Sequence, residues 1–180
     1  MAYYIGKEAL DEKIDKLTDE KYRVVRITPT ITGVQYSNND VLFNTTAIAG
    51  AVRVNGGASK LVSCQLVSKS IDVFDIELMF FTANQSMGTV NAARNVSDSD
   101  FFTAKYLGHL KLDGSANNYN YGNGRIFTFN EIVTGFPKLP IILQSASDST
   151  SVYCAAFLSG DDVTPSFSTG DIELIFGIEL

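Results

Sequence analysis

Apolar and polar residues alternate with a period of two through most of this chain, and this alternation limits the possible folds more than any other feature. In residues 71–81 one strand face is apolar throughout, with Phe74, Ile76, Leu78 and Phe80. Residues 171–180 repeat the pattern with Ile172, Leu174, Phe176, Ile178 and Leu180. Successive side chains of a β-strand point to opposite faces, so this pattern is typical of strands with one buried face. The sequence therefore predicts a chain made mostly of half-buried strands.

Further strands are expected at short spacing, over residues 22–28, 41–43, 51–54, 60–69, 105–112, 125–129, 139–145 and 151–159. Pro29 limits the first of them to the edge or the end of a sheet, because proline has no amide hydrogen to donate. Asn55-Gly56-Gly57 is a turn signal, and residues 113–124 are the most loop-like stretch. About eight to ten short strands predict an all-β fold, a jelly-roll-like antiparallel β-sandwich.

Face assignments follow from the same alternation. In residues 60–69, one face is expected to carry Val62, Cys64 and Leu66. In residues 105–112, Tyr106, Gly108, Leu110 and Leu112 are expected to point inward and His109 outward. Cys64 and Cys154 share strand faces with apolar neighbours and are interpreted as small buried residues. A disulfide between them is possible only if their strands face or neighbour each other.

Residues 7–18 carry the one convincing helical pattern. Leu10, Ile14 and Leu17 fall at i, i+4 and i+7 and form a single apolar stripe among charged residues. A helix of under four turns with one thin stripe is not stable alone in water, so it must pack on something. We therefore divide the chain into an N-terminal helical arm, residues 1–20, for docking or oligomerisation, and a β-sandwich domain, residues 21–180. Ser97-Asp-Ser-Asp100 is expected to cap one further helical turn.

Composition argues against two classes of partner. The net charge is −6 and the pI is near 4.7, and the 14 basic residues are scattered, so nucleic-acid binding is not expected. No apolar run approaches the ~20 residues of a membrane span. Residues 1–6 lack the basic start and apolar run of a signal peptide, so we expect folding in a cytoplasm.

Candidate catalytic and metal-binding groups are sparse in the sequence. His109 is the only histidine, and it is interpreted as a surface strand residue between two lysines. One histidine and two distant cysteines do not make a zinc site. Calcium stays open at Asp113-Gly-Ser-Ala-Asn117, although Gly124 stands where a bidentate Glu is needed, and at Gly160-Asp-Asp162. The sequence is thus interpreted as that of a protein without enzymatic activity and without a cofactor.

The segment around Asn118, Tyr119 and Tyr121 is a candidate binding loop. Tyrosine and asparagine on a loop offer contact area and adaptable hydrogen bonds. The alternative, that the tyrosines cover one end of the sandwich, stays open. An exposed aromatic platform here would favour a receptor-binding or carbohydrate-binding jelly-roll module.

Three parts of the chain resemble a group of tailed-bacteriophage virion structural proteins. The first is Arg26–Thr32 followed by Tyr36 and Asp40-Val41, and the second is Lys60–Lys69 followed by Ile76–Asn84. The third combines Ala156–Ser159, Thr164-Pro165 and Asp171–Ile178. The resemblance covers residues 23–180 and rests on strand and turn patterns; the N-terminal helix is not part of it. It implies a jelly-roll-like fold, no catalysis and a place in the virion.

Apolar residues on the outward strand faces suggest a second, partly covered face. Examples are Val73, Met79 and Ile175. Virion components associate symmetrically, so we expect a homo-oligomer, in the first place a trimer, that contacts the major capsid protein or other virion proteins. The favoured function is that of a capsid decoration or auxiliary capsid protein. The alternatives are the tail, fibre or carbohydrate-binding module and, less compatible with the residues present, a small jelly-roll hydrolase or lyase.

Overall fold

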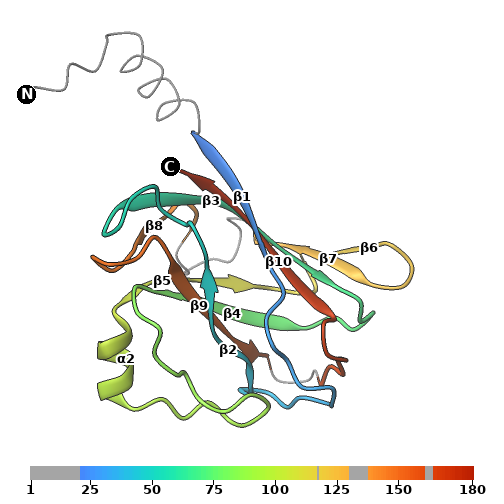
Figure 1. Cartoon of the computed structure of the whole chain (residues 1–180). Helices are drawn as coiled ribbons and strands as arrows, with labels where there is room; N and C mark the ends of the chain where they lie inside the picture. The colour runs from blue at the N-terminus through green and yellow to red at the C-terminus, as the bar shows by residue number, and fades with distance from the viewer. Residues whose placement is uncertain (1–20, 117, 130–137, 161–163) are drawn as a thin grey trace, which may run out of the picture.

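A computed structural model describes residues 21–116, 118–129, 138–160 and 164–180. This part of the chain contains ten strands and one helix (Figure 1). The strands are β1 (Tyr22–Ile27), β2 (Val41–Ile48), β3 (Ala58–Ser68), β4 (Asp75–Phe81), β5 (Tyr106–Leu112), β6 (Asn118–Asn120), β7 (Arg125–Thr128), β8 (Ile141–Gln144), β9 (Val152–Ser159) and β10 (Ile172–Glu179). The helix is α2 (Asp98–Ala104).

The strands form two antiparallel sheets that face each other. The six-stranded sheet has the order β1-β10-β3-β7-β6, and β8 also pairs with β3. β3 is long enough for two partners on one side: Ala58–Leu61 pair with β8, and Gln65–Ser68 pair with β7. The four-stranded sheet has the order β2-β9-β4-β5. The predicted all-β sandwich is therefore confirmed. β1 lies at a sheet edge and ends at Ile27, before Pro29, which agrees with the predicted limit to an edge or an end.

The core lies between the two sheets and is built by the alternating strands. The apolar face predicted for residues 71–81 is fully buried, as is that of β10. Phe80 of β4 meets Phe176 of β10 edge to face, with ring centroids 6.1 Å apart, which joins the two sheets. Cys64 and Cys154 are buried here as free thiols, so their interpretation as small core residues is confirmed.

Two β-bulges change the predicted face assignments. Ser63 pairs with Gly177 but Leu61 pairs with Ile178, so Val62 is an extra residue and β3 shifts its alternation there. Leu61 is consequently buried and Val62 is exposed, which corrects the predicted shared face of Val62 and Cys64.

The second bulge reverses the prediction for Tyr106. Phe80 pairs with Gly108 but Phe81 pairs with Tyr106, so Leu107 is the extra residue. Tyr106 therefore points outward and not into the core. Its ring instead contacts Phe81 on the outer face of the four-stranded sheet.

Other boundaries also differ from those expected. β2 extends from Val41 to Ile48, whereas only residues 41–43 were expected as a strand, because polar residues such as Thr46 still pair with β9. Residues 51–54 form bends and not a strand. The loop-like stretch 113–124 contains the short strand β6, which pairs with β7.

The helix within the described residues is the short turn expected after Ser97. The Ser97 hydroxyl accepts a hydrogen bond from the Asp100 amide at 3.1 Å, which caps the helix N-terminus. Lys105 ends α2 in a left-handed conformation, and its amide donates to the Phe102 carbonyl at 3.2 Å. The expected N-terminal helix, with Leu10, Ile14 and Leu17, lies outside the described residues.

Candidate docking surface

The outer face of the four-stranded sheet is covered by the chain itself. The connection between β4 and β5, which includes α2, lies against this face (Figure 1). A second apolar cluster, separate from the core between the sheets, is buried there; we call it the outer cluster. Its buried members are Val41, Phe81, Met87, Ala104, Ala155 and Phe157. Met79 packs against it, so this outward apolar residue is covered by its own chain.

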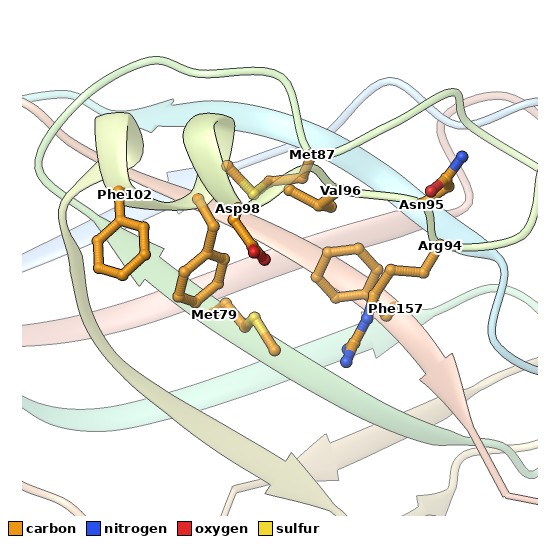
Figure 2. A pocket seen from close by; sticks show the side chains of 9 residues that line it. Met79, Met87, Arg94, Asn95, Val96, Asp98, Phe102 and Phe157 are labelled. Atoms are coloured by element: carbon orange, nitrogen blue, oxygen red, sulfur yellow. The ribbon is translucent and has the colours of Figure 1, made fainter.

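A pocket of about 370 Å³ opens between this connection and the sheet. Met79 of β4 and Phe157 of β9 come from the sheet, and Met87 comes from the connection (Figure 2). Val96, with Phe101 and Phe102 of α2, completes the apolar lining. Methionine side chains adapt to irregular partners, so this lining suits an apolar group on a binding protein.

Arg94 supplies the positive charge of the pocket. Its guanidinium lies over the Phe157 ring (Figure 2), 4.9 Å from the ring centre. Its Nη1 lies 3.0 Å from Oε2 of Glu77. Glu77 and Phe157 are direct neighbours in the β4–β9 ladder, so both contacts come from one point of the sheet. The cation–π contact and the ion pair hold the connection on the sheet. Asp98 is the acidic residue in the pocket lining.

An aromatic row extends from the pocket along the sheet. Phe81 meets Phe101 edge to face at 6.0 Å, and Phe101 stacks on Tyr106 with ring centroids 5.4 Å apart. The Tyr106 hydroxyl hydrogen-bonds Nδ1 of His109. Partial burial, and secondarily the Glu77 charge, raise the pKa of Tyr106. His109 therefore hydrogen-bonds a tyrosine on an outer sheet face, whereas Cys64 and Cys154 are buried in the core. The histidine and the cysteines thus do not form a Cys-His pair.

Phe102 is the feature that makes this surface a candidate for docking. Its neighbours Phe101 and Ala104 turn toward the sheet, whereas Phe102 is 81% exposed. An exposed phenylalanine at an apolar pocket is typical of a protein contact site. Sequence analysis missed it. The available signal was the Phe101-Phe102 pair behind the Ser97 cap, because two adjacent residues cannot share one helix face.

The predicted binding-loop residues lie elsewhere, on the β6–β7 hairpin at the far edge of the six-stranded sheet. Asn118 donates to the Gly114 carbonyl at 2.6 Å and accepts from Arg125. The Tyr121 hydroxyl donates to the Ser68 carbonyl at 3.0 Å. These two side chains fasten the hairpin. Tyr119 is 67% exposed and Tyr121 is 44% exposed, so Tyr119 offers the more accessible ring to a partner.

In the candidate calcium loop, the first carboxylate, that of Asp113, accepts hydrogen bonds from the loop itself. Asp113 accepts hydrogen bonds from the Ser115 hydroxyl at 2.6 Å and from the Ser115 amide at 2.9 Å, and the hydroxyl contact is the main cause of the lowered pKa of Asp113. Within the described ranges, no three His, Cys, Asp or Glu side chains gather as metal ligands would. Asp161 and Asp162 lie outside these ranges.

Comparisons with protein-family models, with curated proteins and with solved structures gave no match to this chain. Among the residues that the structure describes, no helix has the length and apolar character needed to cross a bilayer. A functional proposal therefore depends on the surfaces described above and on the resemblance of the strand and turn patterns.

Proposed function

We propose that this protein is a non-enzymatic structural component of a bacteriophage particle, most simply a capsid decoration or auxiliary capsid protein. It acts by binding other virion proteins and by associating with itself as a small closed homo-oligomer, for which a trimer is the leading model. The observation that carries the proposal is Phe102, exposed at an apolar pocket that its own chain builds on the sandwich. This arrangement serves adhesion between proteins.

The strand order supports a jelly-roll topology. The pairs β1–β2, β3–β4 and β9–β10 each divide between the two sheets, and the order β1-β10-β3-β7 faces the order β2-β9-β4-β5. Two interlocked Greek keys generate this order, and jelly rolls recur in viral capsid and lectin domains. A fold alone does not define a function, so the topology adds to the resemblance and to Phe102 and does not replace them.

Mass spectrometry of purified particles tests the proposal, using the phage whose genome encodes the chain. We expect a stoichiometric protein of 19.6 kDa in the particle fraction. Separation of heads from tails then assigns it to the capsid. A protein found only in the lysate, or a gene that lies outside any phage genome, would contradict the proposal.

Tyr119 supports a second candidate, a receptor-binding or carbohydrate-binding module of a tail or fibre. Its exposed ring on an edge hairpin could stack against a sugar. A glycan array distinguishes the two functions. Binding that Tyr119→Ala abolishes would favour the module, whereas an empty array together with a capsid location favours decoration.

A further inference from the structure

The outer face of the six-stranded sheet is open, in contrast to that of the four-stranded sheet. Tyr22 and Val24 of β1 are 65% and 66% exposed, and Ile142 of β8 is 56% exposed. We call this surface the open face. β1 is the first strand in the sheet order, so the open face ends there at a sheet edge.

Elsewhere in the described part of the chain, the sheet edges are protected against pairing with another strand. At the edge formed by β2, the Val41 amide donates to the Ala92 carbonyl at 2.9 Å, and the Asn91 amide donates to the Val41 carbonyl at 2.9 Å. β5 carries the bulge at Leu107, and β6 has only three residues. Covering segments, bulges and short strands all prevent association between sheet edges.

β1 has none of these protections. Its six residues pair with β10 without a bulge or a proline. The Leu180 amide donates to the Lys21 carbonyl at 2.9 Å, which fixes the direction of the backbone groups along the strand. Because this direction alternates in an antiparallel ladder, the N–H and C=O groups of Tyr22, Val24 and Arg26 point away from β10. No described residue hydrogen-bonds these backbone groups, so they are available to a further strand.

The free edge of β1 is complementary to itself. In an antiparallel pair of two β1 strands centred on Val24, the two Val24 side chains face each other and Tyr22 faces the partner's Arg26. All three residues with free backbone groups then pair, which gives about six hydrogen bonds at two per residue pair. Glu179 is the β10 neighbour of Tyr22, so the partner's Arg26 meets an aromatic ring beside a carboxylate.

The basic residues of β1 favour this register over its neighbours. With the pair centred on Val24, Arg23 faces the partner's Val25, and the Arg23 side chain is held by its own copy through the Gly50 carbonyl at 2.6 Å. Pairs centred on Arg23 or on Arg26 place two arginines directly opposite each other, which is destabilising. A pair centred on Val25 matches only two of the three residues with free backbone groups.

We propose that β1 of one copy pairs antiparallel with β1 of a second copy, centred on Val24, so that the two six-stranded sheets become continuous. The inference goes beyond the proposed function, because it names a two-fold contact that does not depend on a virion. An isologous contact joins copies in pairs, whereas the ring contacts of a trimer are heterologous. The pairing therefore predicts an even number of copies, whether the paired units are monomers or closed rings.

Sedimentation velocity of the full chain at micromolar concentration tests the pairing. Val24→Lys and Val24→Glu each place two like charges opposite each other, so each should weaken the pairing by about tenfold and shift the mass toward half the wild-type value. An equimolar mixture of the two variants should restore the wild-type mass, because lysine then faces glutamate. Only a contact that brings the two copies of residue 24 together gives this recovery.

Ile142→Lys and Ile142→Glu are the matched controls. Ile142 is similarly exposed on the same open face, but β3 and β10 lie between β8 and β1. Both controls should keep the wild-type mass. An odd number of copies in the wild type, Val24 variants of unchanged mass, a mixture without recovery, or an equal loss in the Ile142 variants overturns the inference. Urea midpoints of the Val24 variants should equal that of the wild type at low concentration, which excludes misfolding.

A cysteine at position 24 tests the same register without introducing a charge. Directly opposed residues in a hydrogen-bonded antiparallel pair have Cα atoms about 5.5 Å apart, which suits a disulfide. Val24→Cys should therefore form a cross-linked pair under mild oxidation, and Ile142→Cys should not. The native Cys64 and Cys154 are buried and do not compete. Absence of the Val24→Cys cross-link would contradict the pairing.

The two proposals fail separately. If the protein is present in particles while the Val24 variants keep the wild-type mass, the decoration function stands and the β1 pairing falls. If the Val24 variants behave as expected but the protein is absent from particles, the pairing stands and the virion assignment falls.

Discussion

The two outer faces of the sandwich start from the same sequence pattern and end differently. Both carry apolar residues at outward strand positions, such as Met79 on one and Val24 on the other. On the four-stranded sheet, the connection between β4 and β5 folds back and buries them. On the six-stranded sheet, no described segment does so. Outward apolar residues therefore indicate a sheet face that something covers. Only the structure shows which segment covers it.

The largest expected difference is in stability. Phe157→Ala should lower the free energy of unfolding by about 3–5 kcal/mol, because it removes a buried aromatic ring from the outer cluster. Tyr22→Ala on the open face should cost about 0.5 kcal/mol or less in the monomer. Urea unfolding at low protein concentration measures both. Similar losses in the two variants would mean that the faces do not differ in cover.

The core between the two sheets makes the free energy of unfolding depend on pH, independently of either outer face. Burial raises the pKa of Cys64 and of Cys154, and Cys154 adds to the shift of Cys64. The pKa of a cysteine in the unfolded chain is about 8.5. Below that pH the folded and unfolded states both keep the thiol protons, and the two cysteines do not lower the free energy of unfolding. Above it the unfolded chain releases protons and the native chain does not, so stability falls by up to about 1.4 kcal/mol per pH unit for each cysteine.

Unfolding titrations between pH 8 and 10 measure this slope. A Cys64→Ala, Cys154→Ala double variant should lose it, whereas Phe157→Ala and Tyr22→Ala should keep it. A slope that the double variant retains would assign the effect to other groups, such as the tyrosines.

Arg94 gives an intermediate effect. Arg94→Ala removes the contact with Phe157 and the ion pair with Glu77, and we expect a loss of about 1 kcal/mol. Arg26→Ala is the matched change on the open face, where the pair with Glu173 is more exposed, and should cost about 0.5 kcal/mol or less. The difference in urea midpoints would disappear if the connection were not held by Arg94.

Phe102 should show the smallest effect on stability and a large one on binding. Phe102→Ser should change the free energy of unfolding by less than about 0.5 kcal/mol, because the side chain is already in water. Retention of the variant on particles that lack the wild-type protein should fall sharply. Full retention would remove Phe102 from the docking surface.

The sequence predicted the parts of the fold in which a local pattern has one explanation. The uniform faces of β4 and β10 and the Ser97 cap are of this kind. Val62 and Tyr106 were placed wrongly, because a bulge depends on how a strand matches its partner and leaves no mark in the alternation. β2 was cut short at Phe43 because polar residues followed, although pairing with β9 carries the strand onward.

Local sequence patterns did not predict the candidate docking surface. Met79, Arg94 and Phe157 come from segments that only the order of the four-stranded sheet brings together. In contrast, the composition of the tyrosine-rich loop predicted a binding site, whereas in the structure Tyr121 and Asn118 form hydrogen bonds that hold the hairpin.

The position of β10 has a consequence for biosynthesis. β10 lies between β1 and β3, so it separates the first strand made from the centre of its sheet. On the ribosome, β1 has no strand to pair with until residues 172–179 emerge, and β3 can pair only along the edge that joins β7 and β8. The six-stranded sheet is therefore complete only after β10 is made. A nascent chain stalled before Ile172 would present β1 and one edge of β3 to chaperones or to other nascent copies.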